Sequence, residues 1–160
     1  MARRLLPVGP DFVETAPLRL VFAREVSAPP EAVYRALVDD VPGWPQWFSA
    51  VTFARLLDGG TRREVHLKGG TRALETIVAA EPDTRYAYRV DRINVPGVRA
   101  LLEEWRIVGV PGGARVQWTF AADGTAAFRA VLRLGRSGLG RAFRDAVGAL
   151  DARLASAPRT

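Results

Sequence analysis

The sequence predicts an α+β fold in which one antiparallel sheet of seven strands packs against a long C-terminal helix. Short strand-like segments between residues 50 and 122 are joined by turns rich in Gly and Pro, which is typical of antiparallel neighbours. From about residue 126 the apolar residues recur every three or four positions, as in an amphipathic helix. This terminal helix is the only predicted element long enough to cover the sheet.

The chain begins with a segment that shows no hydrophobic period. Residues 1–17 contain three prolines, so we expect a loosely docked N-terminal arm, followed by a single domain over residues 18–156. Residues 18–27 alternate in part between apolar and polar side chains and are predicted as the first strand.

Two short helices are expected between the first and second strands. The proline pair at residues 29–30 favours a helix start, and the helix must end before Pro42. Proline and glycine within residues 41–48 then allow only a short helical turn, which carries Trp44 and Trp47. These two side chains are expected to pack the small helices onto the sheet, or to close one end of its interior.

The other strands follow in succession and lead into the terminal helix. They are predicted at residues 50–57, 61–68, 71–80, 84–92, 101–110 and 114–122. The connection at 93–100 is longer and more apolar than the other turns. The terminal helix should bend or break near Gly135, because glycines weaken its first half.

Strand pairing through the turns sorts the side chains into an apolar inner face and a polar outer face. In this register Ile77 lies opposite Tyr88, and Trp105 lies opposite Trp118. The expected inner face comprises Glu75, Ile77, Ala79, Tyr86, Tyr88, Val90, Leu101, Glu103, Trp105, Ile107, Val116, Trp118 and Phe120. The expected outer face comprises Arg89, Glu104, Arg106, Gln117 and Thr119.

The inner face carries two carboxylates, Glu75 and Glu103, which need partners because an unpaired buried charge is costly. Arg63 is the nearest candidate partner of Glu75, and such a pair could be purely structural. Alternatively, a carboxylate could anchor a polar group of a ligand, or act as a general base with a raised pKa. We expect Glu103 at the rim, near the connection 93–100.

The composition argues against several classes of site and partner. The chain of 160 residues has no Cys and one His, so disulfides and thiolate metal sites are excluded, and neither metal nor cofactor is expected. The net charge is +6, but the arginines are scattered, so nucleic-acid binding is not expected. No signal peptide or membrane span is apparent. We expect a cytoplasmic monomer or homodimer.

Several segments resemble, in order, the START/Bet-v-1-like (SRPBCC) superfamily, and within it the polyketide cyclase/dehydrase and lipid transport group. They are VSAPPEAVYRALVDD at 26–40, WPQW at 44–47, ETIVAAEPDTRYAYRV at 75–90, EEWRI at 103–107 and GARVQWTF at 113–120. The resemblance covers residues 18 to about 156. It implies a helix-grip fold with a cavity between the concave face of the sheet and the last helix.

The expected function is binding of a hydrophobic small molecule, such as a lipid, a polyketide or another aromatic, in this cavity. The expected ligand contacts are Glu75, Ile77, Tyr88, Val90, Glu103, Trp105, Trp118, Phe120, Phe128, Leu132 and Phe143. The expected gate is the loop of Asn94, Val95, Pro96, Gly97 and Val98.

Two other functions remain open at this point. A cyclase/dehydratase would use Glu75 or Glu103 as general base and Tyr88 or Arg63 as hydrogen-bond donor, provided that these groups converge. The scarcity of histidine counts against catalysis. An interaction module would instead have its interior filled by aromatic side chains, namely Trp105, Trp118, Phe128 and Phe143.

Overall fold

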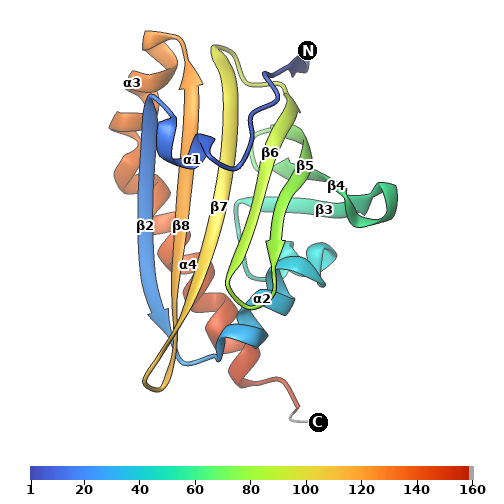
Figure 1. Cartoon of the computed structure of the whole chain (residues 1–160), viewed down its shortest axis with the longest axis vertical. Helices are drawn as coiled ribbons and strands as arrows, with labels where there is room; N and C mark the ends of the chain where they lie inside the picture. Colours follow the sequence, from blue (N-terminus) through green and yellow to red (C-terminus); the bar gives the residue numbers. More distant parts are fainter. Residues whose placement is uncertain (159–160) are drawn as a thin grey trace.

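The computed structural model describes residues 1–158, whose centre is a strongly twisted antiparallel sheet. Seven strands follow the order β2-β8-β7-β6-β5-β4-β3, and β1 pairs with β6. The strands are β1 (Arg3–Arg4), β2 (Leu18–Val26), β3 (Val51–Leu57), β4 (Arg62–Leu67), β5 (Arg72–Glu81), β6 (Arg85–Ile93), β7 (Val98–Val110) and β8 (Gly113–Gly124). Figure 1 shows β2, β8 and β7 along the long axis of the molecule, whereas β3 and β4 run across it.

The helices lie on one side of this sheet. They are α1 (Phe12–Thr15), α2 (Pro30–Val38), α3 (Ala126–Leu134) and α4 (Arg136–Ala155), with 3₁₀ turns η1 (Val41–Gln46) and η2 (Asp58–Gly60). Only α1 departs from this arrangement, because it belongs to the N-terminal arm, which lies on the other side of the sheet. The predicted helix-grip fold is therefore confirmed, with two short helical segments between β2 and β3 and a long C-terminal helix packed on the sheet.

The C-terminal helix packs on the sheet through a narrow apolar stripe, and hydrogen bonds hold its C-terminal end. Phe143, Val147 and Leu150 of α4 are buried against the sheet at the spacing of three to four residues that the sequence shows. Near the C-terminal end of α4 the Asp151 carboxylate accepts hydrogen bonds from the backbone N–H groups of Ser27 and Ala28, both at 3.0 Å. The expected break falls at Gly135, between α3 and α4.

The short helical segments are linked to each other by a side chain. Pro30 starts α2, and Val33 and Leu37 form its buried face. The indole Nε1 of Trp44, in η1, donates to the Leu37 carbonyl at 3.0 Å and so caps the end of α2. This contact brings Trp44 to the interior of the sheet.

The N-terminal arm is packed rather than loosely docked, which differs from our expectation. Between β6 and β7 the ladder ends at the pair Arg89–Leu102, and beyond it the two strands diverge. The arm enters this gap: the Leu5 N–H donates to the Asp91 carbonyl and the Leu6 N–H donates to the Arg99 carbonyl, both at 2.9 Å. It thus satisfies backbone groups that the diverging strands leave unpaired.

The arm also has an inner and an outer side. The Leu5 side chain is buried in an apolar cluster with Val90 and Ile93. Arg4 lies near Arg89 on the outer side of the sheet, where both line a shallow pocket.

The strand register agrees with the expected pairings except at one bulge. Ile77 lies opposite Tyr88, and Trp105 lies opposite Trp118. The register shifts between Ile77 and Ala79, so that Ala79 pairs with Ala87 on the outer face. The expectation of an inward-facing Ala79 is therefore wrong.

The outer face is less exposed than a polar face usually is. Glu104 and Thr119 belong to it and are both buried. The Glu104 carboxylate accepts hydrogen bonds from Nε of Arg85 at 2.6 Å and from Nε of Arg106 at 2.7 Å. These contacts form a cross-strand charge ladder of the kind that the alternation of side chains suggests.

Candidate ligand-binding site

A cavity of about 280 Å³ lies between the inner face of the sheet and helices α3 and α4. A dry cavity of about 150 Å³ is enough to hold benzene, so this one has room for a molecule roughly twice as large. Its wall consists of Trp44, Phe48, Ala50, Val51, Arg63, Val65, Leu67, Thr71, Ala73, Glu75, Tyr88, Val90, Ile93, Val95, Val98, Leu101, Glu103, Trp118, Phe120, Phe128, Leu132, Leu139 and Ala142. Nearly all of these side chains are aliphatic or aromatic.

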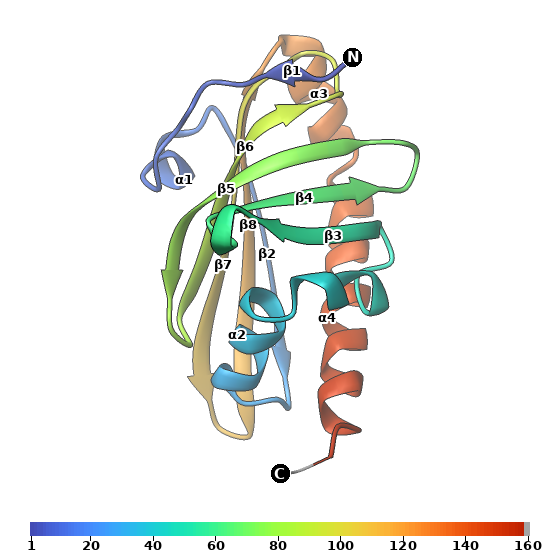
Figure 2. The same cartoon turned by 90° about the vertical axis from the view of Figure 1, so that its right-hand side faces the viewer.

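Part of the cavity wall is half-buried at the β4–β5 turn and along the two C-terminal helices. Leu67 and Thr71 of the turn, and Leu132, Leu139 and Ala142 of the helices, are only half-buried although they line the cavity. Figure 2 shows this turn reaching toward the side of the molecule on which α3 and α4 lie. A ligand would meet mostly small or flexible apolar side chains there.

A buried ion pair between Arg63 and Glu75 also lines the cavity. The Nε of Arg63 donates to the Glu75 carboxylate, and the Arg63 side chain is only 1% exposed. Its guanidinium carbon lies 3.6 Å from the ring centre of Tyr88 and 4.4 Å from that of Trp44, so the cation is held between two aromatic faces. Its Nη1 has no hydrogen-bond partner within residues 1–158.

The second carboxylate of the inner face is held by a hydrogen-bonded chain. Oε2 of Glu103 accepts from the Tyr88 hydroxyl at 2.6 Å and from Nε1 of Trp118 at 3.1 Å. Nε1 of Trp105 in turn donates to the Tyr88 hydroxyl at 3.1 Å. Glu103 is therefore fixed beside the ion pair, whereas we expected it at the rim near residues 93–100.

Burial changes the protonation of these groups. Desolvation raises the pKa of Glu75 to about 7, although the nearby Arg63 charge opposes this change. Desolvation also raises the pKa of Glu103, against the hydrogen bonds from Tyr88 and Trp118. Burial alone would lower the pKa of Arg63, but Glu75 raises it, so the guanidinium stays charged. The site therefore holds one fixed cation and two carboxyl groups whose pKa values are raised above the ordinary glutamate value.

Eight of the expected contact residues line the cavity: Glu75, Tyr88, Val90, Glu103, Trp118, Phe120, Phe128 and Leu132. Ile77, Trp105 and Phe143 do not line it and belong to the packed core instead. Trp105 and Phe143 lie with their ring centres 5.9 Å apart and fill the space beside η1. The interior is thus partly filled by aromatic side chains, but it is not closed.

Several wall residues were missed by the sequence analysis. Trp44 was expected to pack the small helices or to close an end of the interior, and it lines the cavity, as does Phe48, for which no role was expected. Val65 and Leu67 also line it; they follow Arg63 at steps of two residues along β4 and therefore share its face. The pairing of Arg63 with Glu75, once made, could have identified both.

The loop expected to act as a gate is short and is hydrogen-bonded both to the β4–β5 turn and to the start of α3. Val95 and Val98 line the cavity, whereas Asn94, Pro96 and Gly97 do not. The side chain of Asn94 accepts from the Arg72 N–H at 2.8 Å and donates to the Gly70 carbonyl at 2.9 Å. The Gly97 carbonyl accepts from the Thr125 N–H at 2.8 Å, which ties the loop to the start of α3.

The remaining candidate groups stand apart from the cavity. His66 lies on the outer face, where its Nε2 is 2.7 Å from Glu64. Within residues 1–158 there is no group of three or more His, Asp or Glu side chains placed to hold a metal ion. None of the helices in this part of the chain is long and apolar enough to cross a membrane.

Comparison with known proteins agrees with this geometry. An uncharacterised protein of Mycobacterium tuberculosis is 32% identical over 162 residues, which cover 96% of each chain. The solved structure of the protein XoxI from Bacillus cereus has a TM-score of 0.70 at 17% identity and covers 86% of this chain and 96% of its own. A START superfamily protein from Mycobacterium smegmatis has a TM-score of 0.59 at 12% identity and covers 79% of this chain and 96% of its own.

Likeness at such low identity to the two solved structures establishes the fold alone. The family assignment comes from residues 17–155, which match the protein family described as polyketide cyclase / dehydrase and lipid transport. This match shows that the chain belongs to that family.

Proposed function

We propose that the chain binds a hydrophobic small molecule, a lipid, a polyketide or another aromatic, that carries an oxygen at one end. The observation that supports this proposal most is the cavity of about 280 Å³, whose wall is apolar except for one group of buried polar side chains. An apolar pocket with a few convergent polar groups is the usual form of a small-molecule site.

The cluster of polar side chains in the wall suggests that the oxygen-bearing end of the ligand lies deepest in the cavity. The Nη1 of Arg63 has no hydrogen-bond partner among the described residues 1–158, and a protonated carboxyl group of Glu75 or Glu103 would add a second donor. A carbonyl, hydroxyl or phenol oxygen would accept from these donors and would satisfy a buried group that is otherwise unpaired. The aromatic and aliphatic wall would enclose the rest of the ligand.

Native mass spectrometry of freshly purified protein, followed by extraction of the bound material, tests the proposal. Titration with apolar ligands should also change the tryptophan fluorescence, because Trp44 and Trp118 lie in the wall. In Ala142→Trp a large side chain would enter the cavity, so the ligand-dependent change should be lost. Ala149→Trp is the matched control, because Ala149 is exposed on the same helix and does not line the cavity.

The two variants separate binding from a general effect on folding. Retention of ligand by Ala142→Trp would contradict the cavity as its site. Equal loss in Ala149→Trp would show that the extra indole perturbs α4 rather than the cavity.

A second candidate function is proton transfer on a bound ketone, as in a cyclase/dehydratase. It is favoured by the convergence of the groups that the sequence analysis named, since Arg63 contacts both Glu75 and Tyr88, and Tyr88 contacts Glu103. A carboxylate with a pKa near 7 is suited to accept a proton from an acidic C–H group at neutral pH.

Deuterium exchange distinguishes catalysis from binding. A β-diketone that binds in the cavity should exchange its acidic hydrogen faster in D₂O with the protein than without it, and Glu75→Gln should abolish the acceleration while binding persists. A ligand that binds without any faster exchange would contradict catalysis and leave the binding function intact.

A further inference from the structure

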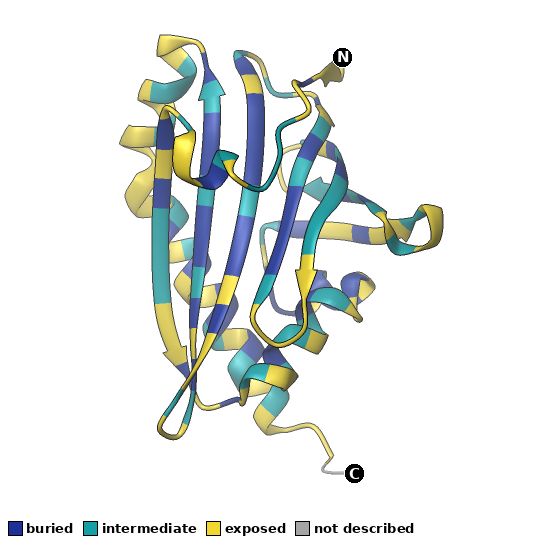
Figure 3. Ribbon diagram, viewed as in Figure 1, coloured by how far each residue is buried: buried dark blue, intermediate teal, exposed yellow. Residues whose placement is uncertain are grey.

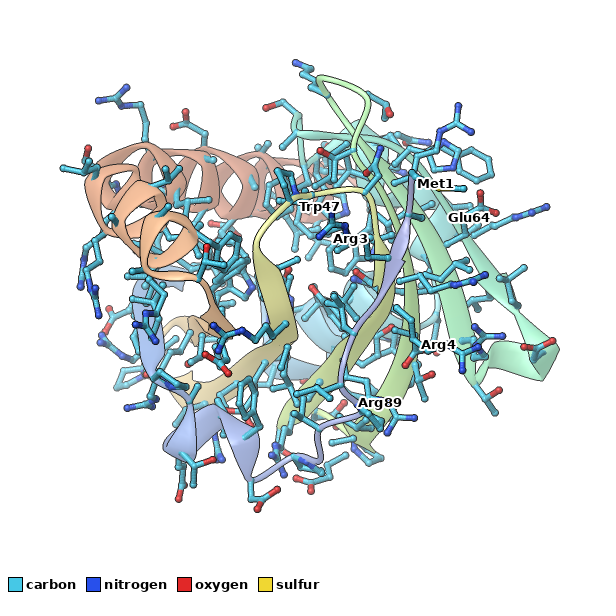
Figure 4. The ribbon with its side chains drawn as sticks, turned by 90° about the horizontal axis from the view of Figure 1, so that it is seen from above. Met1, Arg3, Arg4, Trp47, Glu64 and Arg89 are labelled. Carbon is cyan, nitrogen blue, oxygen red and sulfur yellow. The ribbon has the colours of Figure 1, made fainter. Side chains whose placement is uncertain are left out.

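Helix α3 presents an apolar stripe to solvent as well as to the cavity. Phe128 and Leu132 line the cavity on its inner side. On its outer side Ala127, Ala130, Val131 and Leu134 are all exposed. They follow the spacing i, i+3, i+4, i+7 of one helix face. Val131 is 67% exposed and Leu134 85%, more than any other large apolar side chain within residues 1–158 except Met1. Figure 3 shows α3 as a largely exposed helix at the end of the molecule.

The stripe is surrounded by positive charge. Between Asp123 and Asp145 the chain has five arginines and no acidic residue: Arg129, Arg133, Arg136, Arg141 and Arg144. All of these except Arg129 are exposed. Arg133 lies within α3, and Arg136 follows the break at Gly135, so both lie close to Leu134 along the chain.

We propose that α3 docks on the surface of an anionic lipid membrane, with Val131 and Leu134 inserted and Arg133 and Arg136 against the lipid headgroups. An exposed apolar helix face bordered by arginines is suited to the boundary between headgroups and acyl chains. Basic side chains near an anionic bilayer each strengthen binding by roughly fivefold.

A second copy of the chain fits this surface less well. A two-fold interface would bring the exposed arginines of both copies close to one another. The stripe also contains two alanines and two larger residues, much less surface than the roughly 800 Å² per partner of a stable interface. An anionic membrane surface avoids both the repulsion between arginines and the need for a large apolar interface. It supplies the opposite charge and accepts the insertion of a few apolar side chains.

Docking would place part of the cavity wall near the lipid surface. Leu132 lies in the same helix as Val131 and Leu134 and is a half-buried residue of that wall. A ligand could then pass between bilayer and cavity without crossing water. The docking itself is independent of the proposed function, because it concerns the outer face of α3 and is measured without a ligand.

Vesicle sedimentation of the full chain tests the docking. The probes are vesicles of phosphatidylcholine alone and of phosphatidylcholine mixed with phosphatidylglycerol. We expect binding to the mixed vesicles, which weakens as salt is added, and little binding to the neutral ones. Two double variants, Val131→Ser with Leu134→Ser and Arg133→Glu with Arg136→Glu, should each lower the affinity at least tenfold.

Matched variants control for exposure and for charge. Val108→Ser removes an exposed apolar side chain from β7, and Arg35→Glu with Arg115→Glu makes the same charge change on exposed residues of α2 and β8. Both should bind the mixed vesicles within about twofold of the parent chain. Ligand fluorescence and thermal unfolding should be unchanged in the α3 variants, which shows that they remain folded.

Three outcomes would overturn the proposal. They are absence of binding to the anionic vesicles, an equal loss in the Arg35/Arg115 control, and full binding by the Val131/Leu134 variant. Dimerisation that the Val131/Leu134 variant abolishes would instead assign the stripe to a second copy of the chain.

Discussion

Glu75 shows how a single buried side chain links the site to the stability of the fold. Its pKa rises from 4.5 to about 7 in the folded protein, mainly because it is desolvated. The folded state therefore holds this proton more tightly than the unfolded chain does. As the pH rises between these two values, ionisation favours the unfolded state.

We therefore expect the free energy of unfolding to fall by roughly 3 kcal/mol as the pH rises from 4.5 to 7, since each pKa unit corresponds to about 1.4 kcal/mol. Urea unfolding at a series of pH values measures this change. Glu75→Gln should show a shallower dependence in the same window. A parent chain that grows more stable over this range would show that Glu75 is ionised at low pH in the fold.

At Gly97 the cost of a left-handed backbone can be separated from the cost of a steric clash, by comparison with Gly112. Its φ is +83°, and a Cβ there would lie 2.8 Å from Oγ1 of Thr125. Gly112 has the same φ of +83° and no heavy atom within 4 Å of such a Cβ.

Gly112→Ala should cost roughly 1 kcal/mol, from the left-handed conformation alone. Gly97→Ala should cost at least 1 kcal/mol more, because the methyl group also displaces the start of α3. Urea unfolding measures both changes. If the two variants lost the same free energy of unfolding, the added methyl group at residue 97 would be accommodated at no cost by a shift of the loop away from α3.

Local alternation was enough to predict some residue contacts but not others. It placed Trp105 opposite Trp118, because undisturbed strands keep a period of two. Arg63 was only the nearest candidate for Glu75 by strand order, and the structure pairs these two residues. It failed at Ala79, because the register shift after Ile77 depends on how two strands fit in space. The depth of Glu103 was also missed, since it depends on the hydrogen-bonding positions of Tyr88 and Trp118.

At the scale of elements, the N-terminal arm acts as a short strand that completes the sheet. Leu5 is 6% exposed, whereas its neighbour Leu6 is 58% exposed. Leu5→Ala should therefore lower the free energy of unfolding by about 2–4 kcal/mol. Leu6→Ala should change it by no more than about 0.5 kcal/mol. Similar small losses in both variants would show that the arm is not part of the cooperative unit.

The arm was beyond prediction for a physical reason. Its strand has only two residues, Arg3 and Arg4, and forms because β6 and β7 diverge beyond Arg89. Nothing in residues 1–17 encodes that gap. The break at Gly135, by contrast, follows from the low helix propensity of nearby glycines and was predicted.

At the scale of the whole molecule, an occupied cavity should stabilise the fold. A ligand at about 100 times its Kd adds roughly 2.7 kcal/mol, which corresponds to a rise in Tm of about 5–10 °C for a chain of this size. Thermal unfolding with and without the ligand identified by mass spectrometry measures this rise. Ala142→Trp should show none, and a full shift in that variant would place the ligand elsewhere.

The architecture as a whole was predictable, whereas the shape of the cavity was not. The strands β2 to β8, their antiparallel pairing and the covering helix follow from turn positions and hydrophobic periods, whereas β1 does not. The cavity depends on which large side chains fill the interior, and Trp105 and Phe143 do so while Trp118 and Phe128 border open space. That division is a property of packing in three dimensions rather than of any single segment.

The adjacency of β2 and β8 has a consequence for how the protein folds. Leu18 pairs with Ala122, so within residues 1–158 strand β2 has β8, nearly a hundred residues later in the chain, as its one neighbour in the sheet. Contacts between such distant parts of a chain slow folding, because a large loop must close before any pairing energy is gained. During synthesis β2 has an unpaired edge until β8 leaves the ribosome. A nascent chain stalled before Gly113 would thus expose one apolar strand that no part of itself can cover.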